Sequence, residues 1–262
     1  MSAPPPPPAA EPHPNREQAV RIEPGPKRIR AYLAGVPVVD STHVRLVWER
    51  PGYPTYYFPL DDVRADLLHA NGNVRQSSSR GEAQLYDVTV GERTAPDGAY
   101  RYTNSPVEEL RDLVALSWNT MDHWFEEDEE VRVHARNPYT RVDILSSSRA
   151  VRVEVGGTVV AASQRPVLLF ETGLPTRYYV PKTDVRLDLL EPTESVTACP
   201  YKGQARYWSV VVDGRAHRDL AWSYDYPLPE SIRIAGLICF YNERVDLFVD
   251  DELQVRPKTK FS

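Results

Sequence analysis

The stretch Tyr178-Tyr179-Val180-Pro181, followed by Asp184-Val185-Arg186, has a near-identical counterpart earlier in this chain. Its earlier counterpart, Tyr56-Tyr57-Phe58-Pro59 with Asp62-Val63-Arg64, lies 122 residues upstream. The register continues on both sides and indicates two tandem copies of one domain. The other matching pairs are Trp48-Glu49 with Phe170-Glu171, Gly81-Glu82-Ala83 with Gly203-Gln204-Ala205, and Tyr100-Arg101-Tyr102 with Trp222-Ser223-Tyr224.

The polar run Leu145-Ser146-Ser147-Ser148 marks the expected junction, so we place copy 1 at residues 27–145 and copy 2 at 149–262. Residues 1–26 contain nine of the 24 prolines, including the run Pro4 to Pro8. Proline lacks an amide hydrogen for helix or sheet, which predicts a disordered or polyproline II arm. Recognition of this arm by a proline-binding partner is the alternative to a solvated tail.

The sequence pattern within each copy is that of β structure. Apolar and polar residues alternate over Val151–Val155, Gly156-Gly157 provides a turn, and residues 158–162 return as a hairpin. Helical spacing or capping residues predict short helices at 184–190, from Ser105 to Ala115, and after Pro229. We expect a mainly β protein: two small antiparallel domains, each with packed sheets or an open, tent-like barrel and one or two short helices. The further strands are expected at 29–33, 36–39, 166–170, 206–212 and 236–241.

The composition is that of a globular protein, with 41% apolar and 26% charged residues in 262. A net charge of −6 argues against a nucleic-acid partner, which usually needs a basic face. No apolar run is long enough for a membrane span, and we see no signal-peptide pattern. The two cysteines form no disulfide framework, and the cytoplasm is the expected compartment.

Cys199-Pro200-Tyr201-Lys202-Gly203 combines a thiol, a cation and an aromatic ring in one turn. Lys202 could lower the pKa of the Cys199 thiol and make it a nucleophile. The alternatives are a turn that binds a ligand and a turn that only starts a strand, with Cys199 packed as an apolar group. Cys239, between Ile238 and Phe240, is expected in the core.

Aromatic density near this turn suggests a ligand-binding wall. In this hypothesis Lys202 meets an anionic group, and Glu171 accepts a hydrogen bond. Each aromatic side chain could equally belong to the core. The remaining candidate ligand-binding residues are Tyr201, Trp208, Trp222, Tyr224, Tyr179 and Arg186.

Glu171 and its counterpart Glu49 each end an apolar run and precede tyrosines. Burial beside aromatic rings could raise the pKa of such a carboxyl group and suit an acid or base. An ion pair of Glu171 with Arg177 or Arg186 is the structural alternative. Asp184 could cap a helix that begins near it.

These motifs, and Tyr207-Trp208-Ser209-Val210, resemble the bacterial DUF427 family, a domain of unknown function, in a tandem two-copy form. The resemblance implies a mostly β domain and no established activity. Copy 2 carries the motifs intact. Copy 1 departs from them, with Ser77-Ser78-Ser79-Arg80-Gly81 in place of the cysteine turn and Leu85 in place of Tyr207.

Some naming of the family uses a nucleotidyltransferase label. Such enzymes place a Gly-Ser turn before two acids one residue apart that hold a metal, and this chain has neither Gly-Ser nor Asp-x-Asp. Asp250 and Glu252 are the nearest substitute, with Asp128 and Glu130 in copy 1. The run 126–130 is better explained as a solvated strand edge. The histidines, at 13, 43, 69, 123, 134 and 217, show no metal-ligand spacing.

The first hypothesis is therefore a small-molecule-binding protein with an aromatic-lined pocket at residues 199–203 of copy 2. Its ligand would be a small anionic or aromatic metabolite, and copy 1 would pack against copy 2 as a partner domain. The alternatives are an enzyme, either a metal-dependent nucleotidyltransferase or one with Cys199 as nucleophile, and a structural or interaction scaffold. No residue pattern identifies a cofactor.

Overall fold

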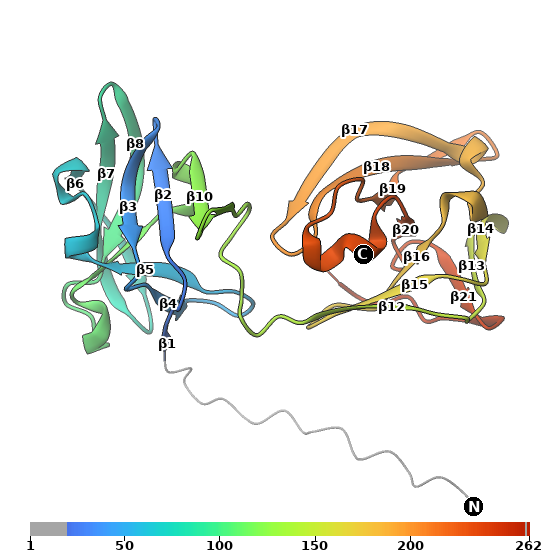
Figure 1. Cartoon of the computed structure of the whole chain (residues 1–262), viewed down its shortest axis with the longest axis horizontal. Helices are drawn as coiled ribbons and strands as arrows, with labels where there is room; N and C mark the ends of the chain where they lie inside the picture. Colours follow the sequence, from blue (N-terminus) through green and yellow to red (C-terminus); the bar gives the residue numbers. More distant parts are fainter. Residues whose placement is uncertain (1–19, 260) are drawn as a thin grey trace, which may run out of the picture. The chain divides into compact units, whose positions relative to one another are not determined.

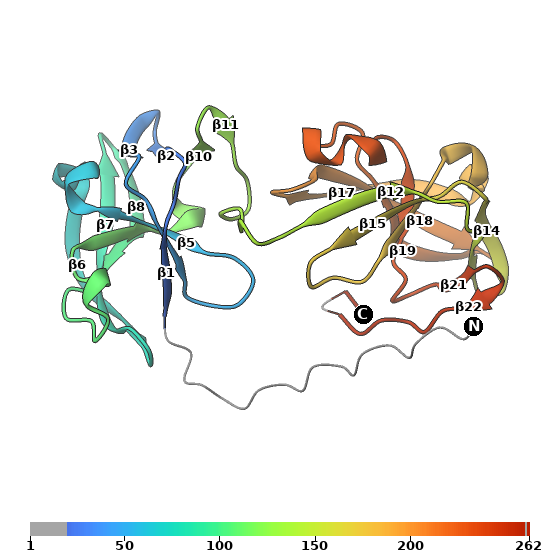
Figure 2. The same ribbon diagram turned by 60° about the horizontal axis from the view of Figure 1, so that its bottom comes forward.

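The computed structural model describes residues 20–259, 261 and 262, and the chain divides into two compact units between Glu130 and Val131. Each unit has one seven-stranded and one four-stranded sheet, and their strand pairs are antiparallel. The four-stranded sheet packs against one face of the larger one (Figures 1 and 2). The predicted mainly β fold with two copies is confirmed, and neither unit is a closed barrel in its described residues.

The first unit orders its large sheet β1-β4-β5-β9-β8-β7-β6 and its small sheet β11-β10-β2-β3. The strands are β1 (Arg21–Pro24), β2 (Ile29–Leu33), β3 (Val36–Ser41), β4 (Arg45–Trp48), β5 (Thr55–Pro59), β6 (Leu68–Ser77), β7 (Gly81–Val90), β8 (Arg93–Arg101), β9 (Leu113–Leu116), β10 (His123–Glu126) and β11 (Glu129–Glu130).

The second unit orders its large sheet β12-β15-β16-β20-β19-β18-β17 and its small sheet β14-β13-β21-β22. The strands are β12 (Val142–Ser146), β13 (Val151–Val155), β14 (Thr158–Ser163), β15 (Val167–Glu171), β16 (Arg177–Val180), β17 (Leu190–Cys199), β18 (Gly203–Val212), β19 (Arg215–Ser223), β20 (Ile238–Phe240), β21 (Asp246–Val249) and β22 (Glu252–Leu253).

The strand order of the second unit repeats that of the first, position by position. Irregularities repeat too: the pairing shifts register between Ala70 and Val74 in β6, and between Pro192 and Val196 in β17. Such bulges bend the strand that carries them. The duplication inferred from the sequence is therefore visible in the topology.

The hairpin β13–β14 shows how the sequence produces this fold. Val151, Val153 and Val155 alternate with half-buried residues, and all three point into the space between the two sheets. Gly156 and Gly157 take positive φ angles of 56° and 81°, which glycine adopts without steric cost. We call the cluster between the sheets the inter-sheet core.

A second cluster, the aromatic core, lies on the opposite face of the large sheet of the second unit. Alternation along the strands separates the two: Tyr207 and Trp222 belong to the aromatic core, whereas Val210 and Ala221 belong to the inter-sheet core. Figure 1 shows the large sheet curling around this face. The buried members are Ile144, Leu169, Tyr179, Ala205, Tyr207, Trp222, Tyr224, Ile234 and Cys239.

The predicted helices at 105–115 and 184–190 are wrong, because tertiary pairing overrides the local pattern. Residues 113–116 are all buried as strand β9, which leaves only the 3₁₀ turn η3 (Glu108–Leu110). Near Val185 an isolated bridge to Ala161 of β14 extends the chain and splits the segment into 3₁₀ turns η5 (Lys182–Asp184) and η6 (Leu187–Leu189). The element after Pro229 is the 3₁₀ helix η7 (Pro229–Ile234). The remaining 3₁₀ turns are η1 (Leu60–Asp62), η2 (Ala65–Leu67) and η4 (Trp118–Thr120).

The ends of the copies also differ from the expected positions. Residues 21–24 pair with β4 as strand β1, so the arm expected over 1–26 ends earlier; residues 1–19 lie outside the described part. Strand β12 covers the expected junction at 145–148 and pairs with β15, which assigns it to the second unit. No described helix is long and apolar enough to cross a membrane.

Candidate functional site

The turn between β17 and β18 places Lys202 at the rim of the aromatic core. Cys199 and Gly203 pair across the turn, and Gly203 has a φ of +95°, which favours glycine. The Lys202 carbonyl accepts a hydrogen bond from Leu228 N at 3.1 Å, which ties the turn to the chain leading into η7. Lys202 is thus held in place by backbone geometry.

Lys202 Nζ forms an ion pair with Glu171 Oε2, at the end of β15. The two side chains are only 11% and 9% exposed, which makes this a buried pair. Sequence reasoning expected Arg177 or Arg186 as the partner of Glu171. Both are otherwise engaged, because Arg177 binds Glu243 and Arg186 binds Asp188.

Tyr201 contacts the segment of residues 134–137, which precedes β12. Its hydroxyl accepts a hydrogen bond from Asn137 N at 2.7 Å, and its ring makes an edge contact with His134. Arg136 Nε donates to Pro200 O at 3.0 Å. The segment 134–137 therefore anchors the outside of the turn.

Tyr179, Trp222 and Tyr224 do come together on the face that Lys202 borders. Trp222 Nε1 donates to Tyr179 Oη at 3.2 Å, with the two rings in a T-shaped contact at 6.3 Å. Trp208 lies on the opposite face and packs against the inter-sheet core, with Lys182 Nζ 5.9 Å from its ring centroid. Arg186 is exposed beside Asp188.

Asp184 does not cap a helix, since neither η5 nor η6 has a side-chain cap. Its carboxylate accepts hydrogen bonds from Ser163 Oγ at 2.7 Å and from Arg165, which fastens η5 to β14. Asp62 accepts from Ser41 Oγ at 2.6 Å at the matching place in the first unit. This contact is architectural.

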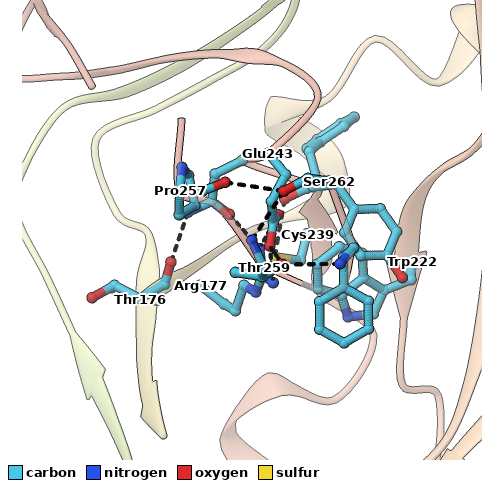
Figure 3. Close-up of polar contacts among 12 residues, drawn as sticks. Thr176, Arg177, Trp222, Cys239, Glu243, Pro257, Thr259 and Ser262 are labelled. Carbon is cyan, nitrogen blue, oxygen red and sulfur yellow. Dashed lines mark hydrogen bonds and ion pairs between the residues drawn. The ribbon is translucent and has the colours of Figure 1, made fainter. Parts of the chain in front are cut away.

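A second buried ion pair, which sequence reasoning did not identify, lies beside Trp222 (Figure 3). Arg177 donates to both carboxylate oxygens of Glu243, at 2.6 and 2.8 Å, and to Asn242 Oδ1 at 2.8 Å. Burial favours protonation of Glu243, but hydrogen bonds from Arg177 and Thr259 outweigh it and lower the pKa of Glu243. The one available signal was that Arg177 replaces Thr55 of copy 1.

The first unit has an ion pair at the same place as Glu171 and Lys202. Arg80 occupies the position of Lys202, with its Nε 3.8 Å from Glu49 Oε1. The hydroxyls of Tyr57 and Tyr100 also donate to Glu49, and Arg80 Nε donates to Tyr102 Oη at 3.4 Å. Copy 1 thus has Ser77 at the position of Cys199 but has a cation, Arg80, at the position of Lys202.

The corresponding polar groups in the second unit have fewer partners. Glu171 Oε1 and Tyr224 Oη, the counterparts of Glu49 Oε1 and Tyr102 Oη, have no hydrogen bond from any residue that the structure describes. Tyr224 is nevertheless 5% exposed. Burial raises the pKa of the Tyr224 hydroxyl, reinforced by its proximity to Cys199.

An open depression of about 240 Å³ lies next to Glu171. Its lining mixes charged, hydroxyl and apolar side chains. The lining residues are Arg141, Asp143, Phe170, Glu171, Thr172, Leu174 and Thr176.

Residues 21–127 and 143–251 both match the model of a family described as a domain of unknown function (DUF427). The chain belongs to the DUF427 family. The two matches follow one another as tandem DUF427 domains. No curated protein matches this chain.

The short name of the DUF427 model, NTP_transf_9, carries the nucleotidyltransferase label. Asp250, a weak metal candidate, accepts hydrogen bonds from Arg149 Nε at 2.7 Å and Ala150 N at 3.0 Å. Glu252 is exposed on β22. Within the described residues no three His, Cys, Asp or Glu side chains form a group that could hold a metal ion.

The remaining sequence candidates are placed as follows. Cys199 is half-buried at the turn, whereas Cys239 is fully buried, and burial raises the pKa of its thiol to about 12. The acidic run 126–130 is not solvated throughout. Glu126 is 4% exposed and accepts a hydrogen bond from Tyr56 Oη at 2.5 Å.

Proposed function

We propose that the second DUF427 domain binds a small organic molecule at the Glu171–Lys202 pair. The supporting observation is the contrast between the two copies. In the first unit Tyr57, Tyr100 and Arg80 surround the carboxylate of Glu49. In the second, Lys202 engages one oxygen of Glu171, and the other is left to a ligand.

The chemistry of these groups defines the ligand. The Lys202 ammonium has three N–H donors, of which Glu171 takes one, so it can still meet an anionic or carbonyl oxygen. The Tyr224 hydroxyl can donate to the same molecule or accept from it. The buried rings of Tyr179 and Trp222 form the apolar packing beside these groups.

The open depression next to Glu171 gives a measure of the space at this end of the site, and Glu171 is the one group of the proposed site that lines it. About 240 Å³ lies below the roughly 300–1,000 Å³ of pockets for drug-sized molecules. A metabolite with a single ring or a short acid chain fits this space. The proposed ligand is therefore a small anionic or aromatic metabolite.

Tyr224→Phe tests this proposal with little risk to folding. The substitution removes a hydroxyl that has no partner among the described residues, so stability should stay within about 0.5 kcal/mol of the wild type. A ligand found by thermal shift against a metabolite panel should bind about tenfold more weakly, the effect of one lost hydrogen bond. Binding would be followed by isothermal titration calorimetry.

Tyr102→Phe in the first unit is the matched control, because it removes the hydroxyl that Arg80 contacts. It should leave ligand affinity unchanged. Equal affinity in wild type and Tyr224→Phe, or a panel without any hit, would contradict binding at this site.

A further inference from the structure

A separate place on the same unit has the geometry of a site for an aromatic ring. Three side chains form it: Arg177 of β16, Trp222 of β19 and Tyr241, which follows β20. We call this the ring slot. It shares Trp222 with the aromatic core and contains neither Glu171 nor Lys202, so the inference rests on Arg177, Trp222 and Tyr241 and not on the Glu171–Lys202 pair.

In the ring slot, the two flat faces of the Arg177 guanidinium group are available to aromatic rings. Its edges are occupied by Glu243 and Asn242, and the residue is 7% exposed. Its Cζ lies 5.6 Å from the Trp222 ring centroid and 5.8 Å from that of Tyr241. A guanidinium placed in this way attracts aromatic rings through cation–π contacts.

The chain's own Phe261 fills the ring slot in this structure. Its ring lies 5.7 Å from Tyr241 at an interplanar angle of 36°, and Arg177 Cζ lies 5.7 Å from its centroid. Trp222 and Tyr241 are in contact at 4.5 Å beneath it. A planar ring in the place of Phe261 would meet the same faces.

The segment that carries Phe261 is attached to the sheet through side chains. Thr259 Oγ1 donates to Glu243 Oε1 at 2.6 Å (Figure 3), while Phe261 N and Ser262 Oγ bond to Thr259 and Pro257 of the same segment. The described residues beyond Leu253 belong to no strand. Local displacement of such a segment costs little free energy compared with unfolding of the unit.

We infer that the ring slot binds an uncharged planar aromatic ligand, such as an indole or a purine base, in competition with Phe261. The charge of Arg177 is already matched by Glu243, which favours an uncharged ring over an anion. The Phe261 side chain carries no polar atom, so a ligand in the ring slot would replace its contacts with Tyr241 and Arg177 by similar ones. Competition lowers the apparent affinity by the fraction of time that Phe261 occupies the slot.

The test measures binding of indole to the full chain by isothermal titration calorimetry. Phe261→Ala should raise the affinity for indole about tenfold. This factor is the equilibrium constant expected for occupation of the ring slot by Phe261, which contacts one ring and one cation there. Tyr226→Ala, which removes a ring that is 92% exposed outside the slot, should leave the affinity unchanged. Cyclohexanol, of similar size but not planar, should gain little from Phe261→Ala.

A second measurement uses the wild type and does not depend on folding of the variant. Saturating indole should shift the Trp222 Nε1–H resonance, assigned through Trp222→Phe, and should speed hydrogen exchange of the Phe261 amide. The inference is overturned by equal affinity in wild type and Phe261→Ala, by an equal gain for cyclohexanol, or by indole binding that leaves both signals unchanged.

Discussion

Lys202→Met should destabilise the second unit strongly, because it leaves the Glu171 carboxylate buried without a cation. Glu171 is 9% exposed at its side chain, and the described residues give it no other hydrogen-bond donor. Removing one member of a buried ion pair costs about 3–5 kcal/mol. Since a tenth of each side chain still reaches water, we expect a loss of about 3 kcal/mol in the free energy of unfolding.

Arg80→Met is the same operation in the first unit and should cost less, about 1 kcal/mol. Glu49 keeps the hydroxyls of Tyr57 and Tyr100 as donors, and Arg80 lies 3.8 Å away rather than in close contact. The duplicated fold thus provides a matched control within one chain. The difference between the two variants measures the combined effect of the tyrosine donors and of the longer ion pair in the first unit.

Differential scanning calorimetry would follow the transition of each unit. Lys202→Met should lower the melting temperature of the second unit by about 10–15 °C, and Arg80→Met that of the first by about 3–5 °C. Lys202→Met combined with Glu171→Leu should recover most of the loss, since no charge remains buried. Equal losses in the two single variants, or a double variant as unstable as Lys202→Met, would refute the reasoning.

Three further predictions concern other groups. Iodoacetamide at pH 8 should modify Cys199 in the native protein and reach Cys239 only after denaturation, because burial raises the pKa of the Cys239 thiol to about 12; mass spectrometry of the adducts checks this. The pKa of Glu243 lies below its ordinary value of 4.5 in the folded state. The contribution of Glu243 to stability is therefore present above about pH 4.5 and is lost as the pH falls through the folded pKa. Glu243→Gln should reduce the change in the urea midpoint between about pH 5 and 2.5. Gly203→Ala should cost about 1–2 kcal/mol, because a φ of +95° strains any residue with a Cβ, and thermal melts would show it.

The fold could be predicted from the sequence because the motifs of one domain occur in both copies and can be compared. The repeated Tyr-Tyr-x-Pro motif fixed the alignment of the copies, and the alternation over Val151–Val155 predicted a strand that the structure contains. The predictions of helices were wrong because they rested on capping residues and spacing within a short segment, without its tertiary contacts. Ser105 and Pro106 resemble a helix start, yet residues 113–116 gain more by pairing in the middle of a sheet.

The site was predicted only in part. Side chains alternate between the two faces of a strand, and a bulge interrupts this alternation, so the face of a residue is known only when the bulges are known. Trp208 and Trp222 were grouped by density, but pairing in β18 and β19 places them on opposite faces. The partner of Glu171 comes from a turn 31 residues away, a separation that sequence spacing does not resolve. Comparison of the copies would have suggested it, since Arg80 aligns with Lys202.

The register shifts of the large sheets bear on how the two halves can differ. They fall at matching places in both halves, in β6 and β17 and again in β7 and β18, near Tyr86 and Trp208. Two copies of one domain are expected to share such bends when the bulges belong to the domain itself. The two halves therefore share the curvature of the large sheet and differ in the side chains that it carries, so a difference in binding between the halves would come from the side chains and not from the backbone.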